Sequence, residues 1–237
     1  MKQQEGRAFK LFLKKHTKKK LSAILSGTFV TAVLQSSSIV NLMVLSFVGA
    51  GILSMRNAIG VVLGANIGGT VNSWLVALLG FKVNMGAATL PIIGIAGIGL
   101  VIFKNKKNYY NLCRFVLGFG LLFMGLDYMK QSMDAAILNF DFKPYLKYHK
   151  IVFLLIGFVI TALIQTSAAT IVIVLSAVNA QILPLETAVA VVLGAELGTT
   201  VKIVLGAIGG IAAKKRVALG NSIFNIVSTA FGFILLS

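Results

Sequence analysis

The 237-residue sequence has few charged residues, one cysteine, two histidines and three prolines. Asp, Glu, Lys and Arg together make up 12% of the chain, whereas soluble domains carry about 25%. The lone Cys113 excludes an intrachain disulfide and any metal site built from several cysteines. No cluster of His, Cys or carboxylate residues has a catalytic spacing, so we expect a chain that is not an enzyme and that needs no cofactor.

Long apolar segments take the place of the missing charges. Hydrophobic residues make up 57% of the chain, and the mean hydropathy is +0.93. Several uncharged segments approach or exceed the roughly 18 residues that indicate a membrane-spanning helix. We therefore predict an all-α, multi-pass membrane protein with the lipid bilayer as its surroundings. The predicted spans cover residues 58–79, 86–103, 112–129, 186–209 and 216–236.

The 22 basic residues outnumber the six acidic ones and give a formal net charge of +16. They lie in the breaks between apolar segments and not on one solvated face beside aromatic residues, which argues against nucleic acid as a partner. The lysines of residues 1–20 interrupt the segment too often for a signal peptide. We interpret this segment as a basic amphipathic helix that lies on the membrane surface.

The sequence contains an internal repeat at an offset of 130 residues. Residues 31–71 align without a gap on residues 161–201, and 20 of these 41 positions are identical. The matches include Gln, Gly and Thr residues, which unrelated membrane helices rarely share in register. We therefore predict two copies of one helical unit, a first repeat over 21–110 and a second over 111–237, with a site where the copies meet.

Each repeat begins with an apolar segment, 21–53 or 151–183, that is too long for one span and carries polar residues near its middle. A re-entrant helical hairpin, which enters and leaves by one face, fits these segments. Three full spans then separate matching positions, so the second repeat is predicted to be inverted. The inverted arrangement places sixteen of the 22 basic residues on one face, which the positive-inside rule assigns to the cytoplasm together with the N-terminal segment. We therefore predict that the protein lies in the cell membrane.

The polar motifs of the two repeats resemble those of the sodium/phosphate cotransporter family, of the type II kind with paired QSSS motifs. The first repeat carries QSSS at 35–38 and GANIGGT at 64–70, and the second carries QTSA at 165–168 and GAELGTT at 194–200. The resemblance covers most of the chain. It implies sodium-coupled transport of inorganic phosphate, with sodium as the coupling ion and the motif residues lining a site for both. The implied binding residues are Gln35, Ser36, Ser37, Ser38, Asn66, Thr70, Gln165, Thr166, Ser167, Glu196, Thr199 and Thr200.

The chemistry of these side chains suits both ions. Gln, Ser and Thr oxygens can hold sodium, while hydroxyls, amide groups and the free N–H groups of broken helices can hold an oxyanion. The alternatives are that the hydroxyls bond to carbonyls of their own helix and that the glutamines only join helices. The glycines of 64–69 and 194–198 either interrupt their helices or allow close packing. We favour a discontinuous helix at each of these segments.

Three positions of the second repeat depart from the pattern of the first. Glu196 matches Asn66, Lys202 matches Asn72, and Ala168 replaces a serine. Ionisable residues at membrane depth usually have a partner, so we expect Glu196 and Lys202 to compensate each other's charge. Glu196 could instead be a cation ligand, or Lys202 could extend to the cytoplasmic edge.

Two other functions fit the same sequence. The chain could carry a different small anion, or it could be a non-transporting membrane subunit that senses or scaffolds. A homo-oligomer is compatible with either function. The first repeat lacks a counterpart of the span at 112–129, so we expect that a span is missing, either because the start was placed late or because the sequence is a fragment.

Overall fold

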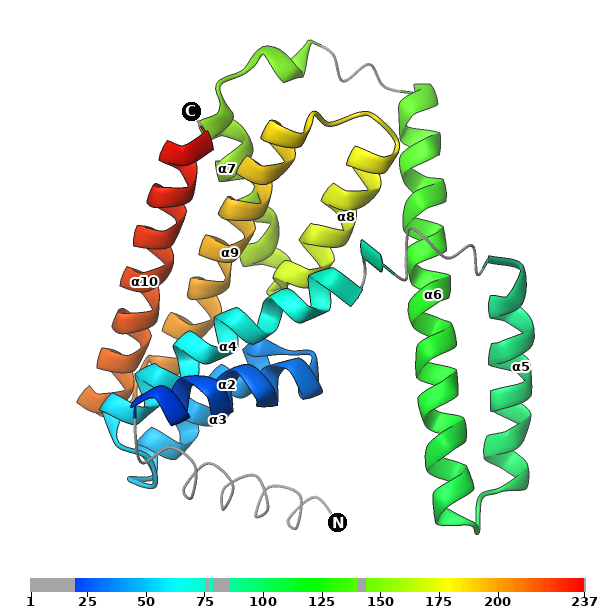
Figure 1. The fold of residues 1–237 in the computed structure, drawn as a ribbon, viewed down its shortest axis with the longest axis horizontal. Helices are drawn as coiled ribbons and strands as arrows, with labels where there is room; N and C mark the ends of the chain where they lie inside the picture. Colours follow the sequence, from blue (N-terminus) through cyan, green and yellow to red (C-terminus); the bar gives the residue numbers. More distant parts are fainter. Residues whose placement is uncertain (1–19, 76, 79–85, 140–143, 237) are drawn as a thin grey trace. The chain divides into compact units, whose positions relative to one another are not determined.

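A computed structural model describes residues 20–75, 77–78, 86–139 and 144–236 (Figure 1). Residues 1–19 of the predicted surface helix lie outside the described residues. The described part of the chain contains helices and no strand, which confirms the predicted all-α class. The elements are α2 (Lys20–Leu34), α3 (Ser37–Gly49), α4 (Met55–Leu75), α5 (Gly86–Ile102), α6 (Lys107–Asn139), the short 3-10 helix η2 (Tyr145–Lys147), α7 (Lys150–Ile164), α8 (Ser167–Asn179), α9 (Leu185–Ala207) and α10 (Ala212–Leu236).

Four of the described helices are long and apolar enough to cross a membrane. They are Met55–Leu75, Lys107–Met129, Leu185–Ala207 and Ala212–Leu236. The helices α2, α3, α7 and α8 are apolar but only 13 to 15 residues long. At about 1.5 Å per residue each of these four is shorter than a bilayer core of about 30 Å. They have the length expected of half-helices.

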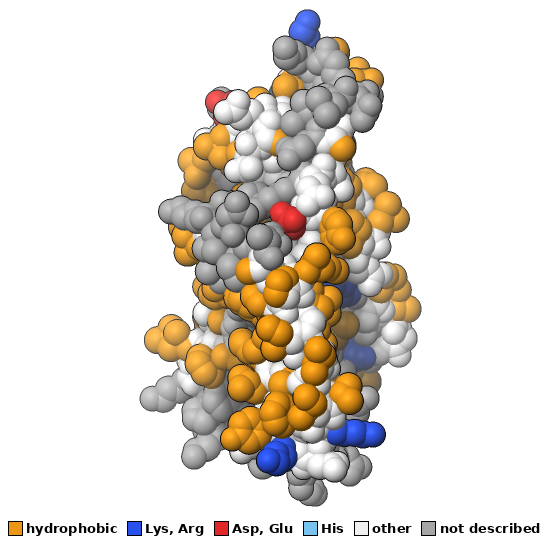
Figure 2. Space-filling model, turned by 90° about the vertical axis from the view of Figure 1, so that its right-hand side faces the viewer, with side chains coloured by type: hydrophobic (Ala, Val, Ile, Leu, Met, Phe, Trp, Pro, Cys, Tyr) orange, Lys and Arg blue, Asp and Glu red, His pale blue; other side chains and the backbone are white. Residues whose placement is uncertain are grey.

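The described chain separates into two compact units. The first unit falls within residues 1–74, 148–171 and 185–237, and the second within residues 75–147 and 172–184. In the second unit α5 and α6 pack side by side. Hydrophobic side chains are spread widely over the described surface in the view of Figure 2. Ile95 and Val101 of α5 and Phe115 of α6 are each at least 70% exposed, which suits a lipid-facing surface.

Close helix pairs form the frame of the first unit. A Cβ atom added at Gly64 of α4 would lie 1.9 Å from the Ile24 carbonyl oxygen of α2. At the matching position of the second repeat, a Cβ atom at Gly194 of α9 would lie 1.9 Å from the Leu154 carbonyl oxygen of α7. The backbones are therefore nearly in contact at both crossings, as glycine allows in membrane helices. The repeated sequence corresponds to a repeated helix crossing.

The predicted discontinuity of two helices is wrong. Met55–Leu75 and Leu185–Ala207 are continuous α-helices through the glycine-containing segments 64–69 and 194–198. Glycine at these positions permits a close crossing, and a single glycine costs a helix only about 1 kcal/mol relative to alanine. Packing therefore explains the glycines without an interruption.

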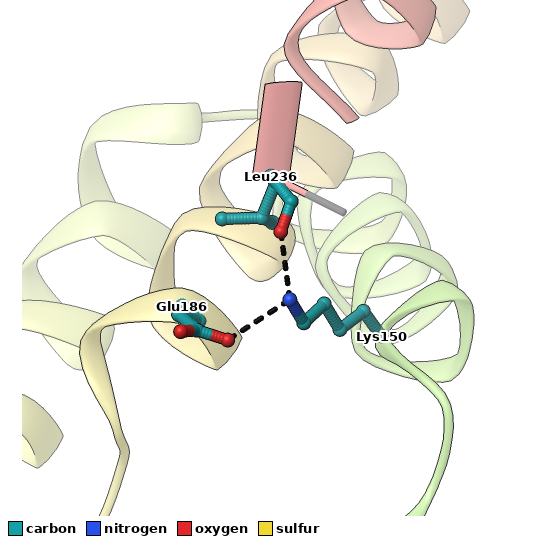
Figure 3. A network of polar contacts seen from close by, with 3 residues as sticks. All are labelled: Lys150, Glu186 and Leu236. Carbon is teal, nitrogen blue, oxygen red and sulfur yellow. Dashed lines mark hydrogen bonds and ion pairs between the residues drawn. The ribbon is translucent and has the colours of Figure 1, made fainter. Parts of the chain in front are cut away.

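The helix α10 completes the first unit by packing against α9 and α3. Apolar residues such as Val44 of α3, Val61 of α4 and Val217 of α10 form one buried cluster. At the far end of α10 the Lys150 ammonium lies 2.9 Å from a Glu186 carboxylate oxygen and donates to the Leu236 carbonyl at 2.7 Å (Figure 3). This contact joins the first turns of α7 and α9 to the last turn of α10.

Candidate functional site

The chain breaks at matching glutamines in the two repeats. Gln35, between α2 and α3, has a φ of 53°, and Gln165, between α7 and α8, has a φ of 62°. Positive φ is uncommon outside glycine and marks a sharp end of each helix. The Gln165 N–H donates to the Thr161 carbonyl at 2.7 Å, which caps α7. Each long apolar segment is thus a pair of half-helices with Gln-Ser or Gln-Thr at its break.

The second half-helix of each pair begins immediately after the break. Ser36 caps α3, and its hydroxyl oxygen accepts from the Ile39 N–H at 3.3 Å. The helix α8 begins at Ser167. The first turn of a helix carries N–H groups without helical partners and the positive end of the helix dipole, which together favour an anion.

These two helix starts border one polar cavity of about 40 Å³ in the first unit. At roughly 10–15 Å³ for each water-sized sphere, the cavity has room for a few waters or a small ion. Hydroxyl and amide side chains dominate its wall. The lining residues are Gln35, Ser36, Ser37, Ser38, Gly69, Ser73, Thr166, Ser167, Ala168 and Ile171.

The structure therefore brings half of the predicted binding residues to one cavity. Gln35, Ser36, Ser37 and Ser38 come from the first repeat, and Thr166 and Ser167 come from the second. Ser73 of α4 also lines the cavity and was not among the predicted residues. Ser73 lies outside the 64–70 motif. It follows Thr70 by three residues, which is close to one turn of the helix, so the two residues lie near the same face of α4.

Three of the predicted threonines bond to their own helices. Thr70 donates to the Ile67 carbonyl at 2.8 Å, Thr199 to the Glu196 carbonyl at 2.6 Å, and Thr200 to the Leu197 carbonyl at 2.7 Å. Gln165 is exposed and is not among the residues that line the cavity. In this conformation the hydroxyls of the three threonines therefore bond to carbonyls of their own helices, which is the alternative to a ligand role that the sequence left open.

Asn66 belongs to a network that the sequence did not predict. Its amide nitrogen donates to the side-chain oxygens of Asn221, at 3.3 Å, and of Asn225, at 3.1 Å. The Asn225 amide nitrogen in turn donates to the Glu196 carbonyl at 3.3 Å. The network joins α4, α10 and α9 inside the first unit. Two asparagines four residues apart in the apolar span at 216–236 are a signal that could have found it.

The charged side chains of Glu196 and Lys202 both belong to α9. The Lys202 ammonium donates to the Ser38 hydroxyl oxygen at 2.6 Å. The two charged groups form no ion pair with each other in the described part of the chain, so the predicted mutual compensation is not observed as a contact. The reason is helix geometry. Six residues on a continuous helix correspond to about 600°, which leaves the two side chains about 120° apart around α9.

Spanning helices, broken hairpins and a hydroxyl-lined cavity between them define a multi-pass membrane protein of the transporter class. The pattern that describes the Na+/Pi-cotransporter family matches residues 1–131 and 145–237, and the chain belongs to that family. The family is one of transporters, which agrees with the expectation that the chain is not an enzyme.

Curated relatives are similar over most of this chain. It is 31% identical to the "Uncharacterized protein YqeW" of Bacillus subtilis over 213 residues, which cover 89% of this chain and 67% of the relative. It is 27% identical to the "Putative inorganic phosphate export protein YjbB" of Escherichia coli over 230 residues, which cover 94% of this chain and 41% of the relative. The chain thus spans less than half of the second relative. No solved structure matches the chain significantly.

Proposed function

We propose that the chain carries out sodium-coupled secondary transport of inorganic phosphate, with the polar cavity of the first unit as the binding site. The observation that supports this proposal most directly is the meeting of the two repeat motifs at one cavity beside the starts of α3 and α8. Membership of the Na+/Pi-cotransporter family and the printed name of the YjbB relative agree with phosphate as the transported anion.

The cavity wall offers what a phosphate ion requires. Phosphate has several acceptor oxygens, and the wall supplies hydroxyl donors from Ser36, Ser37 and Thr166 together with N–H groups of the first helical turns. Because the donors come from both repeats, a bound anion would join the two hairpins. The anion would therefore favour a conformation in which both tips are close, as alternating access requires.

Sodium would use the same wall in a different way. It needs oxygen atoms with free lone pairs, which serine and threonine hydroxyls and the Gln35 amide carbonyl can provide. A bound cation also offsets the charge of the anion in a region of low dielectric constant, where an uncompensated charge is costly. This mutual compensation is the physical basis on which the two ions would be coupled.

The decisive experiment is uptake of labelled phosphate into proteoliposomes that contain the purified chain. Uptake should require a sodium gradient, should be unchanged by an equal potassium gradient, and should fall at least about tenfold when Ser36 and Thr166 are both replaced by alanine. Uptake of another anion with no phosphate uptake would identify a different substrate. Absence of sodium-dependent binding and transport of any small anion would favour a sensor or scaffold.

The direction of net transport is tested in the same vesicles. The name of the YjbB relative describes export, whereas the resemblance of the motifs implies sodium-driven movement. We propose that the direction of the sodium gradient sets the direction of phosphate movement. Reversal of the gradient should reverse the net flux. A flux that keeps its direction after reversal would contradict sodium coupling.

A further inference from the structure

A lysine of α9 touches the wall of the polar cavity. The Lys202 ammonium lies 2.6 Å from the hydroxyl oxygen of Ser38, in α3. Ser38 is among the residues that line the cavity, whereas the described lining does not include Lys202. The positive charge of Lys202 is therefore one hydrogen-bonded residue away from any ion that the cavity holds.

The charge of Lys202 has no negative partner among the described residues. The ion pair that they contain joins Lys150 to Glu186, in the first turn of α9, and Glu196 forms no ion pair with Lys202. Lys202 lies within the candidate span Leu185–Ala207. An uncompensated charge in such a region of low dielectric constant is costly, and ionisable residues there usually have a partner. The described part of the chain supplies the ammonium group with a hydroxyl acceptor but with no counter-charge.

The end of the helix that Lys202 meets is itself positive. Ser38 is the second residue of α3, so the ammonium lies beside the N-terminal turn of that helix. The N-terminus of a helix carries partial positive charge and favours an anion over a cation. Two positive features thus meet at one wall of the cavity. An anion in the cavity would offset both of them.

The contact with Lys202 also fixes the role of the Ser38 hydroxyl. An ammonium group only donates hydrogen bonds, so the Ser38 oxygen accepts and its hydrogen is left for another partner. A serine in a helix commonly donates to the carbonyl three or four residues before it, but α3 begins at Ser37 and contains no such carbonyl. The hydroxyl hydrogen can therefore turn toward an acceptor in the cavity, which an oxyanion provides.

We propose that Lys202 is a positioning and specificity-determining residue, which gives the cavity a fixed positive charge and turns the Ser38 hydroxyl toward a bound oxyanion. This inference rests on the proposed function. It assigns part of the charge compensation of phosphate to the chain itself, so that sodium supplies the remainder. A fixed charge is present whether or not sodium is bound, and its removal should therefore matter most when sodium is scarce.

The departures from the internal repeat agree with this role. Lys202 takes the place of Asn72, and Ser38 is matched by Ala168 in the second repeat. The lysine and its acceptor are thus each present in one repeat only, and the fold brings them together across 164 residues of sequence. The charge acts on the part of the wall that the first hairpin contributes.

The test measures the KM for phosphate at several sodium concentrations, for the full chain and for Lys202→Met in proteoliposomes. At the lowest sodium concentration that supports uptake by the unmodified chain, the variant should have a KM at least about tenfold higher. At saturating sodium the difference should shrink to within about threefold, because sodium then compensates more of the anion's charge. A loss of folded protein would lower the maximal rate and would not move the KM. A KM that rises by the same factor at every sodium concentration would overturn the fixed charge.

Two conservative variants separate the charge of Lys202 from its hydrogen bond. Lys202→Arg keeps both and should restore the KM to within about threefold of the unmodified chain. Lys202→Gln keeps a neutral donor and should resemble Lys202→Met, so equal rescue by Arg and Gln would contradict a role of the charge. Lys215→Met is the control for loss of a lysine from the first unit. Lys215 lines a separate apolar pocket with Val204 and Leu219, and its replacement should leave the KM unchanged.

The route through Ser38 is tested by a double-mutant cycle. Ser38→Ala removes the hydroxyl that Lys202 orients, and it should also raise the phosphate KM. The double variant should have a KM well below the product of the two single effects, because the two changes remove one shared interaction. Strictly multiplicative effects would show that the lysine acts without the serine and would overturn this route.

The outcomes also separate this inference from the proposed function. If the unmodified chain neither binds nor transports phosphate, the proposed function is wrong, and the inference is wrong with it. If the unmodified chain shows sodium-dependent phosphate uptake and Lys202→Met leaves the KM unchanged at every sodium concentration, only the role of Lys202 is wrong.

Discussion

At the scale of single residues, the matching glutamines at the hairpin breaks have different surroundings. Gln35 lines the cavity and its amide donates to the Ala32 carbonyl, whereas Gln165 is exposed and is not among the described lining residues. Both hold a left-handed backbone conformation. The two glutamines therefore share the backbone geometry of the break, whereas Gln35 alone of the two is among the described residues that line the cavity.

We expect Gln35→Ala to reduce phosphate transport at least about tenfold more than Gln165→Ala, because only the first removes an amide from the cavity wall. Uptake normalised to the amount of folded, monodisperse protein checks this prediction. Equal losses in the two variants would show that Gln165 reaches the substrate in another conformation of the transporter.

Asn225 has a structural role that can be separated from transport. Asn225→Ala removes one of the two acceptors of the Asn66 amide nitrogen and one of the donors to the Glu196 carbonyl. We expect a loss of about 0.5–1.5 kcal/mol in stability for each hydrogen bond removed. The matched control is Ser222→Ala, because the hydrogen bond that the described structure gives the Ser222 hydroxyl lies within its own helix, to the Ala218 carbonyl. Thermal unfolding in detergent compares the two variants, and an equal stability of both would contradict the role of the network.

At the scale of helices, the main feature is the contrast between broken and continuous elements. The apolar segments that carry Gln35 and Gln165 break into half-helices, while α4 and α9 run without interruption through their glycines. Each continuous helix is crossed by a half-helix at backbone contact, which holds the hairpins of the first unit in place. The polar tips are therefore supported by rigid helices.

This packing predicts that Gly194→Ala destabilises the protein, because the new Cβ atom would lie 1.9 Å from the Leu154 carbonyl oxygen and would push α7 away from α9. We expect a cost of about 1–3 kcal/mol. The control is Gly94→Ala in α5, where a Cβ atom would meet nothing within 4 Å and alanine should favour the helix by up to about 1 kcal/mol. A lower unfolding temperature for Gly94→Ala than for Gly194→Ala would contradict the packing argument.

At the scale of the whole molecule, large apolar side chains are exposed on helices of both units, including Ile98 in the second unit and Ile234 in the first. Such surface is normally solvated by lipid, because membrane helices satisfy their backbone polar groups internally. The exposed apolar residues and the four candidate spans together describe a multi-pass membrane protein. The orientation of the two repeats in the membrane stays a prediction from charge.

The predicted inversion can be tested by labelling single cysteines from the two sides of the membrane in a Cys113→Ala background. Cysteines at Lys106 and Lys215 should react from the cytoplasmic side, and a cysteine at Lys147 should react from the opposite side, because the basic residues sort this way in the inverted arrangement. Membrane-impermeant maleimide applied to intact and to inverted vesicles gives the readout. If the cysteine at Lys147 reacts from the same side as the others, the repeats are parallel.

The sequence alone determined the helical class, the duplication and the polar interruption of the two long apolar segments at their glutamines. These properties depend on local composition and on comparison of the chain with itself, since apolar length and a polar interruption are visible without knowledge of any contact. The family resemblance was also available, because its motifs are contiguous in the chain.

Only the tertiary structure decided which polar side chains share a cavity and which partners they have. Ser38 and Lys202 are 164 residues apart, and their contact depends on the rotation of α9 about its own axis. The same rotation separates Lys202 from Glu196, and the side chains of Asn221 and Asn225 in α10 provide the partners of Asn66. A sequence specifies which faces of a helix are polar, but the opposing helix decides whether a polar group finds a ligand, a side chain or its own backbone.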